Sequence, residues 1–123
     1  MKQNLKIYGP PVFYAVMIFI VSSVPSLQLN TGFSYQDKLA HIIEYTVFGF
    51  LLQRAFHIDK GRNFRYFICA LAIGSVFSVF DEIHQLWIPG REAEIGDFIA
   101  DIIGVLLGQG LFFLNYRIMV FRR

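Results

Sequence analysis

Cysteine, charge and polar linkers are all scarce in this chain of 123 residues. Cys69 is the single cysteine, so no disulfide can form within the chain, and its apolar neighbours predict a small buried residue there. Charged residues make up 16% of the sequence, whereas a soluble domain has about 25%. No long linker or low-complexity segment divides the sequence, which indicates a single domain over residues 1–123.

Apolar residues are abundant instead. Hydrophobic types account for 55% of the chain and aromatic types for 17%, with a mean hydropathy of +0.51. This composition predicts an integral membrane protein, whose partner is the lipid bilayer. The net charge is +2, but the cations flank apolar runs and form no basic stripe, so nucleic-acid binding is not expected.

Four apolar stretches predict an all-α, polytopic bundle of four transmembrane helices, because each is near the roughly 20 residues that a helix needs to cross a bilayer. They cover residues 7–24, 37–56, 64–88 and 97–120. The first stretch, with its basic start, also fits a cleaved signal peptide. We favour an anchor, because cleavage would remove a packing partner from the bundle.

Charge sets the expected orientation. Lys and Arg gather at the amino terminus, around the second connection and at the carboxyl end, so these parts should be cytoplasmic, both termini included. Of the nine acids, all but Asp59 cluster around the other two connections. Glu92 and Glu94 among them are expected to be solvated loop charges.

Polar residues recur at helical spacing near the outer ends of the last three stretches. An ionised side chain well inside hydrocarbon costs about 2.5–3.5 kcal/mol, so such residues must face one another or a water-filled cavity. The sequence therefore predicts an outward-open polar pocket. Its candidate residues are Asp37, Lys38, His41, Glu44 and Tyr45, then Asp81, Glu82, His84 and Gln85, then Asp97 and Asp101.

Some of these residues also have structural explanations. Asp37 and Asp97 lie where helices should start, where an acid caps free amides. The spacing of Gly104 and Gly108 favours helix packing. Arg91 follows a Pro-Gly turn, and its guanidinium would either pair with neighbouring acids or bind a phosphate or carboxylate.

The runs DKLAHIIEYTVFGFLL and FDEIHQLWIPGREAEIGDFIADIIGVLLG resemble the VanZ-like family of small bacterial membrane proteins, named for a teicoplanin-resistance protein. The resemblance implies a protein of the bacterial cytoplasmic membrane and, in some members, lowered susceptibility to glycopeptide antibiotics. It implies no settled reaction. Asp101 departs from the pattern, since family members often have Asn there. The positions that the resemblance marks are Asp37, Lys38, His41, Tyr45, Glu82, Gln85, Arg91, Asp97 and Gly104.

One class of function is an enzyme acting on an envelope component, such as a lipid-linked wall precursor or a phospholipid head group. Glu82 or Glu44 would then be the general base, His41 a proton carrier or metal ligand, and Lys38 with Arg91 an anion clamp. The remaining candidates are Asp81 on the catalytic side and Gln85, Tyr45, Asp37, Asp97 and Asp101 on the substrate-binding side.

The other classes involve no reaction: a small-molecule carrier, a lipid-binding module, or a structural subunit whose polar cluster ties helices together. Against a carrier, we expect only apolar residues between the pocket and the Arg-rich ends. Clustered carboxylates and an imidazole could also hold a divalent cation. The sequence has no cysteine pair and no HExxH helix, so it leaves the metal and the cofactor unknown. A homo-oligomer is compatible with all of these classes.

Overall fold

All the regular secondary structure in the described part of the chain is α-helical, as the sequence predicts. The computed structural model describes residues 2–25 and 35–121. Their four helices are α1 (Lys2–Ser22), α2 (Tyr35–Lys60), α3 (Phe64–Gln85) and α4 (Ile95–Phe121). The helix α3 ends before the predicted limit at residue 88, because the chain turns after Gln85, with Ile88 N–H donating to the Gln85 carbonyl.

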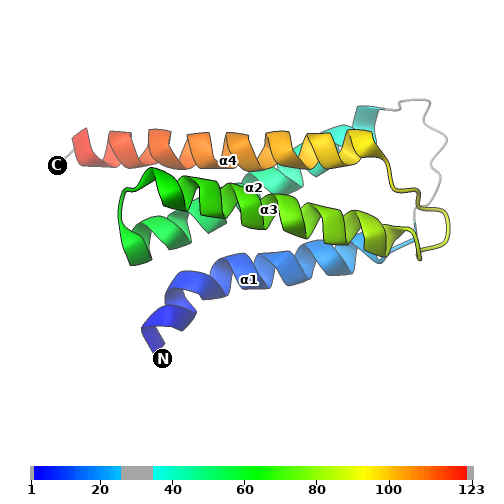
Figure 1. Cartoon of the computed structure of the whole chain (residues 1–123), viewed down its shortest axis with the longest axis horizontal. Coiled ribbons are helices and arrows are strands. Elements are labelled where there is room, and N and C mark those ends of the chain that lie inside the picture. The colour runs from blue at the N-terminus through cyan, green and yellow to red at the C-terminus, as the bar shows by residue number, and fades with distance from the viewer. Residues whose placement is uncertain (1, 26–34, 122–123) are drawn as a thin grey trace.

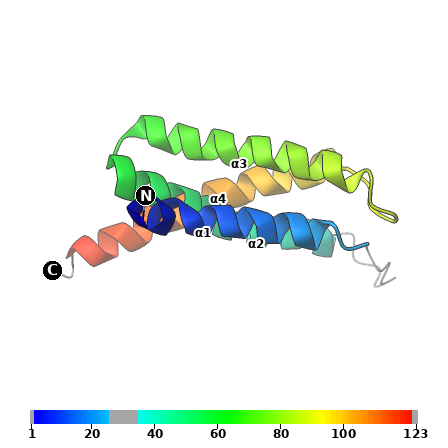
Figure 2. The ribbon, with the colours of Figure 1, turned by 90° about the horizontal axis from the view of Figure 1, so that it is seen from below.

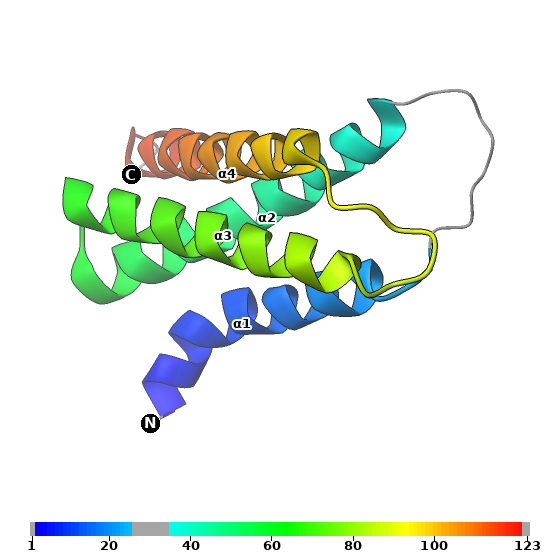
Figure 3. The same ribbon diagram turned by 45° about the vertical axis from the view of Figure 1, so that its right-hand side comes forward.

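The helices run lengthwise beside one another, and both ends of the chain lie at the same end of the bundle (Figure 1). The views in Figure 2 and Figure 3 show the same arrangement, with the α3–α4 connection at the opposite end. Pro10 and Pro11 lie inside α1, and the helix bends in its amino-terminal part (Figure 1). We call the end with the α3–α4 connection the acidic end, because it holds Asp37, Asp81, Asp97 and Asp101.

Three helices are long and apolar enough to cross a membrane: α1, α3 and α4. The fourth predicted span lies on α2, which is not among them. The reason is its composition, since α2 contains charged residues at both ends as well as His41, Glu44 and Gln53. The fold therefore provides three apolar helices and one of mixed polarity.

Polarity is inverted relative to a water-soluble protein. Large apolar side chains are exposed along α1, α3 and α4, whereas Asp101, Gln109 and Ser78 are completely buried. Such a surface suits a lipid solvent, because exposed apolar area of this extent is rare on soluble monomers. Cys69 also faces outward on α3, so the prediction that it is buried is wrong.

The helices α2 and α4 form the most extensive contact, and glycines make it possible. A Cβ at Gly104 would lie 2.7 Å from the Ile42 carbonyl oxygen, and a Cβ at Gly108 would collide with the Thr46 carbonyl oxygen. On the opposing helix, Gly49 meets the backbone of α4 at residue 105 in the same way. The packing role predicted for Gly104 and Gly108 is confirmed.

Candidate functional site

A buried histidine lies at the centre of the acidic end. His41 of α2 is 5% exposed, and its Nδ1 lies 2.8 Å from Oδ1 of Asp101 on α4. The second carboxylate oxygen of Asp101 accepts a hydrogen bond of 2.5 Å from the Ser78 hydroxyl on α3. Three helices thus fix one imidazole, and a carboxylate partner on Nδ1 leaves the other ring nitrogen to act as a base or ligand.

Two neighbouring acids on α3 have different surroundings. Asp81 is held by the Ser22 hydroxyl of α1 at 2.6 Å and by the Gln85 amide at 3.3 Å. Glu82 is 7% exposed; one of its oxygens accepts from the Glu94 backbone N–H at 3.2 Å, and Oε1 has no hydrogen-bond partner among the described residues. An unpaired buried acceptor is costly, which makes Glu82 an unusual group in a folded bundle.

Lys38 is already engaged within the protein. Its ammonium lies 2.7 Å from Glu94 and 3.1 Å from Asp97. The hydrogen bond from Lys38 lowers the pKa of the Glu94 carboxyl below its usual range. Glu94 is exposed in the loop between α3 and α4, as the sequence predicts, and it also forms an ion pair with Lys38. Glu92 is exposed as well.

Arg91 leaves its charge available. Its Nε donates to the Val24 carbonyl at 3.3 Å, and within residues 2–25 and 35–121 no carboxylate lies within 4.0 Å of its guanidinium. Arg91 borders a polar cavity of about 510 Å³. The other lining residues of this polar cavity are Asp37, Gln85, Gly90, Glu92, Glu94 and Asp97.

An apolar groove adjoins the polar cavity. It has a volume of about 220 Å³, and Glu94 lines both spaces. Glu82 also lines the groove, and its carboxylate accepts a hydrogen bond from the backbone of Glu94, the residue that the two spaces share. The remaining walls come from the ends of α3 and α4 and the loop between them: Val79, Ile83, Leu86, Ala93, Ile95 and Phe98.

Several donor atoms lie close enough to share a cation. One ligand atom from each of His41, Glu82 and Asp101 lies within 4.8 Å of the other two, and all three residues are buried. Asp37, His41 and Asp97 form a second such group. Because His41 belongs to both groups, it connects the buried acids to the lining of the polar cavity.

Two other predicted residues, Tyr45 and Glu44, line neither the polar cavity nor the groove. Tyr45 is completely buried against the rings of Phe48 and Phe77, and so belongs to the apolar core beneath His41. Glu44 is half-buried. Of the two proposed general bases, Glu82 lines the groove and Glu44 does not.

Serine residues were missed by the sequence analysis. Ser78 follows the same α3 stripe as Glu82 and Gln85, at spacings of four and seven residues, and this pattern was the available signal. Ser22 had no comparable signal, because its partner Asp81 is 59 residues away in the sequence. Only the packing of α1 against α3 brings the two together.

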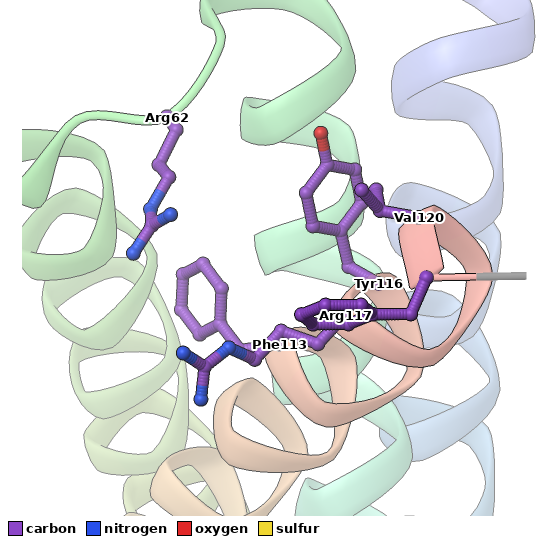
Figure 4. A pocket seen from close by; sticks show the side chains of 6 residues that line it. Arg62, Phe113, Tyr116, Arg117 and Val120 are labelled. Atoms are coloured by element: carbon purple, nitrogen blue, oxygen red, sulfur yellow. The ribbon is translucent and has the colours of Figure 1, made fainter. Parts of the chain in front are cut away.

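The opposite end of the bundle holds a different cavity. It has a volume of about 600 Å³ and is lined by Arg62, Phe113, Tyr116, Arg117, Val120 and Phe121. Figure 4 shows the Arg62 and Arg117 guanidinium groups on the same side of it, near the Phe113 ring. This lining has no carboxylate and no imidazole, so it lacks the acid-base groups that the acidic end provides.

Polar side chains also occur between the two ends. Gln109 donates from Nε2 to Oε1 of Gln53 and to the Phe67 carbonyl, both at 2.9 Å, and both glutamines are buried. The prediction that the inner half contains only apolar residues is wrong. The pair follows from close α2–α4 packing, since a buried amide needs a polar partner.

Comparison with known proteins identifies the family. A family model described as VanZ/LLP1 matches residues 9–118. The chain belongs to the VanZ/LLP1 family. The resemblance found in the sequence is thereby confirmed, and the match also includes most of α1, ahead of the motifs that suggested it. No curated protein and no solved structure matches the chain.

Proposed function

We propose that this VanZ/LLP1 protein is a multi-pass protein of the bacterial cytoplasmic membrane that acts on or binds an envelope lipid at its outer face. The main support for the proposal is that the apolar groove, which Glu82 lines, meets the polar cavity at Glu94. An amphiphile with a hydrocarbon chain and a charged head group suits such a pair of spaces. A lipid-linked wall precursor or a phospholipid meets that description.

An anionic head group would bind through Arg91, the one cation among the described residues of a cavity lining that otherwise contains four carboxylates. Arg91 lines the polar cavity, and no carboxylate of the described residues forms an ion pair with its guanidinium. A planar fork of donors suits phosphate. Lys38 is a weaker candidate than the sequence suggested, because Glu94 and Asp97 already occupy its ammonium. The anion clamp therefore consists chiefly of Arg91.

Acid–base chemistry would use the buried His41–Asp101 pair and Glu82, which lines the groove. Asp101 holds Nδ1 of the His41 ring, so His41 can accept a proton at Nε2, its other ring nitrogen. Glu82 can accept a proton at its unpartnered Oε1. Either group could activate a hydroxyl or a water against the head group.

The membrane arrangement is part of the proposal. We infer that α2 crosses the bilayer with the three apolar helices, because its buried side includes His41 and Gln53 while its exposed side presents Leu39, Ile43 and Val47. These three residues are spaced four apart and form an apolar stripe that suits lipid. By the positive-inside rule, the acidic end faces outward and both termini face the cytoplasm.

The test compares wild type with Glu82→Gln and Arg91→Gln in a glycopeptide-susceptible Gram-positive host at matched membrane abundance. Arg65→Gln is the control, because Arg65 is an exposed arginine at the other end of α3. Ala93→Phe tests the groove separately by filling it without changing a charge. Mass spectrometry of envelope lipids and wall precursors is the readout, with teicoplanin susceptibility measured alongside.

A lipid or precursor that changes with wild type and Arg65→Gln, but not with the three site variants, would support an enzyme. Altered susceptibility without any chemical change would support lipid binding or shielding. If Glu82→Gln and Arg91→Gln behaved like wild type in every readout, the proposal would be wrong. Loss of membrane abundance in all site variants would instead favour a structural subunit.

A further inference from the structure

The acidic end buries more negative charge than its cations neutralise. Asp81, Glu82, Asp97 and Asp101 are each at most 7% exposed. Lys38 contacts Asp97, and His41 contacts Asp101. In the described ranges, no Lys or Arg nitrogen lies within 4.0 Å of Asp81 or Glu82. Burying a carboxylate without a counter-charge costs several kcal/mol, so another positive charge would stabilise this end.

The donor geometry indicates where that charge would lie. The ligand atoms of His41, Glu82 and Asp101 lie within 4.8 Å of one another. These residues are on α2, α3 and α4, respectively. One carboxylate oxygen of Glu82 belongs to this group; the residue is more than nine-tenths buried, and among the described residues its Oε1 has no hydrogen-bond partner. An acceptor in that state is what a missing ligand would leave behind.

A second ligand group links the site to the polar cavity. Asp37 and Asp97, which line the polar cavity, form the second ligand group with His41. A cation entering through the polar cavity would meet these two carboxylates first and the three buried ligands next. Carboxylates at an entrance also raise the local cation concentration.

We propose that His41, Glu82 and Asp101 bind a divalent first-row transition-metal cation. One imidazole with two carboxylates suits Mn²⁺ or Zn²⁺, whereas Mg²⁺ and Ca²⁺ favour all-oxygen ligands. The proposal rests on the acidic end being a functional site, yet cation binding can be measured without any envelope lipid. Failure of cation binding and failure of the lipid function are therefore distinguishable.

The experiment uses the full chain, purified in detergent and freed of metal with a chelator. Mn²⁺ alone is titrated by calorimetry and by electron paramagnetic resonance, in which coordination reduces the signal of the free ion. We expect wild type to bind one Mn²⁺ per chain, displaceable by Zn²⁺. Glu82→Gln and Asp101→Asn should each weaken binding at least about tenfold. Asp59→Asn removes an exposed carboxylate at the other end of α2, outside both ligand groups and the polar cavity, and should bind like wild type.

Wild type that binds no Mn²⁺ and no Zn²⁺ would overturn the proposal, and so would a Glu82→Gln variant that binds as tightly as wild type. Thermal unfolding of the metal-free proteins separates ligand loss from misfolding. Metal-free Glu82→Gln should melt no lower than wild type, because it removes a buried unpaired charge, and added Mn²⁺ should raise the melting temperature of wild type only. If neither melting temperature responds to Mn²⁺, the site is not a metal site.

Discussion

Asp101 shows how a single buried carboxylate connects three helices. It accepts from Ser78 and pairs with His41, and its side chain is completely buried. An amide in its place keeps one acceptor oxygen but cannot accept the second bond. We therefore expect Asp101→Asn to lower the free energy of unfolding by about 1–3 kcal/mol.

The measurement is detergent-induced unfolding of chelator-treated protein, followed by circular dichroism, so that metal loss does not contribute. Asp59→Asn is the control, since Asp59 is on the surface at the other end, and should change the free energy by less than about 0.5 kcal/mol. Asp101→Asn as stable as wild type would show that the interactions of Asp101 contribute little to stability.

Individual residues could be predicted where burying their charge in an apolar span costs free energy. Glu82 and Asp101 were identified because an acid inside an apolar span has few structural explanations, and both are buried at the acidic end. Pairings were less predictable. The contacts of Lys38 with Glu94 and of Ser22 with Asp81 each join residues more than 50 positions apart, so only the packed helices determine them.

At the scale of the elements, the α2–α4 contact depends on missing side chains. A Cβ at Gly108 would collide with the α2 backbone, whereas a Cβ at Gly110 would meet nothing within 4 Å. We expect Gly108→Ala to lower the free energy of unfolding by about 1–3 kcal/mol through overpacking. Gly110→Ala should be neutral or stabilising by about 0.5–1 kcal/mol, because alanine favours the helix.

Both glycine variants are on α4, two residues apart, so unfolding measured under one condition compares them directly. Equal stability of the two would mean that the helices do not approach each other as closely as the structure has them.

The attachment of α1 is a second property of an element. Ser22 Oγ donates to buried Asp81, while the adjacent Ser23 donates only to Phe19 of its own helix. Ser22→Ala would leave Asp81 with the longer bond from Gln85 alone. We expect a loss of about 1–2 kcal/mol for Ser22→Ala and less than about 0.5 kcal/mol for Ser23→Ala.

Detergent-induced unfolding again measures the difference, and protease accessibility of α1 provides a local readout. Should Ser23→Ala destabilise the protein as much as Ser22→Ala, the link between α1 and α3 would have no special importance. The question bears on function, because this bond holds α1 beside the acidic end.

The whole molecule was predictable to the extent that lipid restricts the choices. Long apolar stretches with few charges must form helices, so the all-α architecture and the approximate helix limits followed from composition. The face that each residue presents was harder to predict, as Cys69 and Gln109 show. Helix rotation is set by contacts between helices, and a stretch that is apolar all round contains little information about it.

The orientation of the helices in the membrane is a property of the whole molecule. In a Cys69→Ser background, single cysteines are placed by Gln36→Cys at the start of α2, Arg62→Cys in the α2–α3 connection and Glu92→Cys in the α3–α4 connection. A membrane-impermeant maleimide is added to intact cells and, in parallel, to permeabilised cells. The exposed side chains at these positions make all three accessible to the reagent once it reaches their side of the membrane.

We expect labelling at 36 and 92 in intact cells and at 62 only after permeabilisation, because the basic connection is retained in the cytoplasm. Opposite labelling of 36 and 62 shows that α2 crosses the bilayer despite its mixed polarity, and opposite labelling of 62 and 92 shows the same for α3. If 36 and 62 were labelled from the same side, α2 would not span the membrane. His41 would then lie on a helix that does not cross the bilayer, and a head-group site inside the outer leaflet would no longer be tenable.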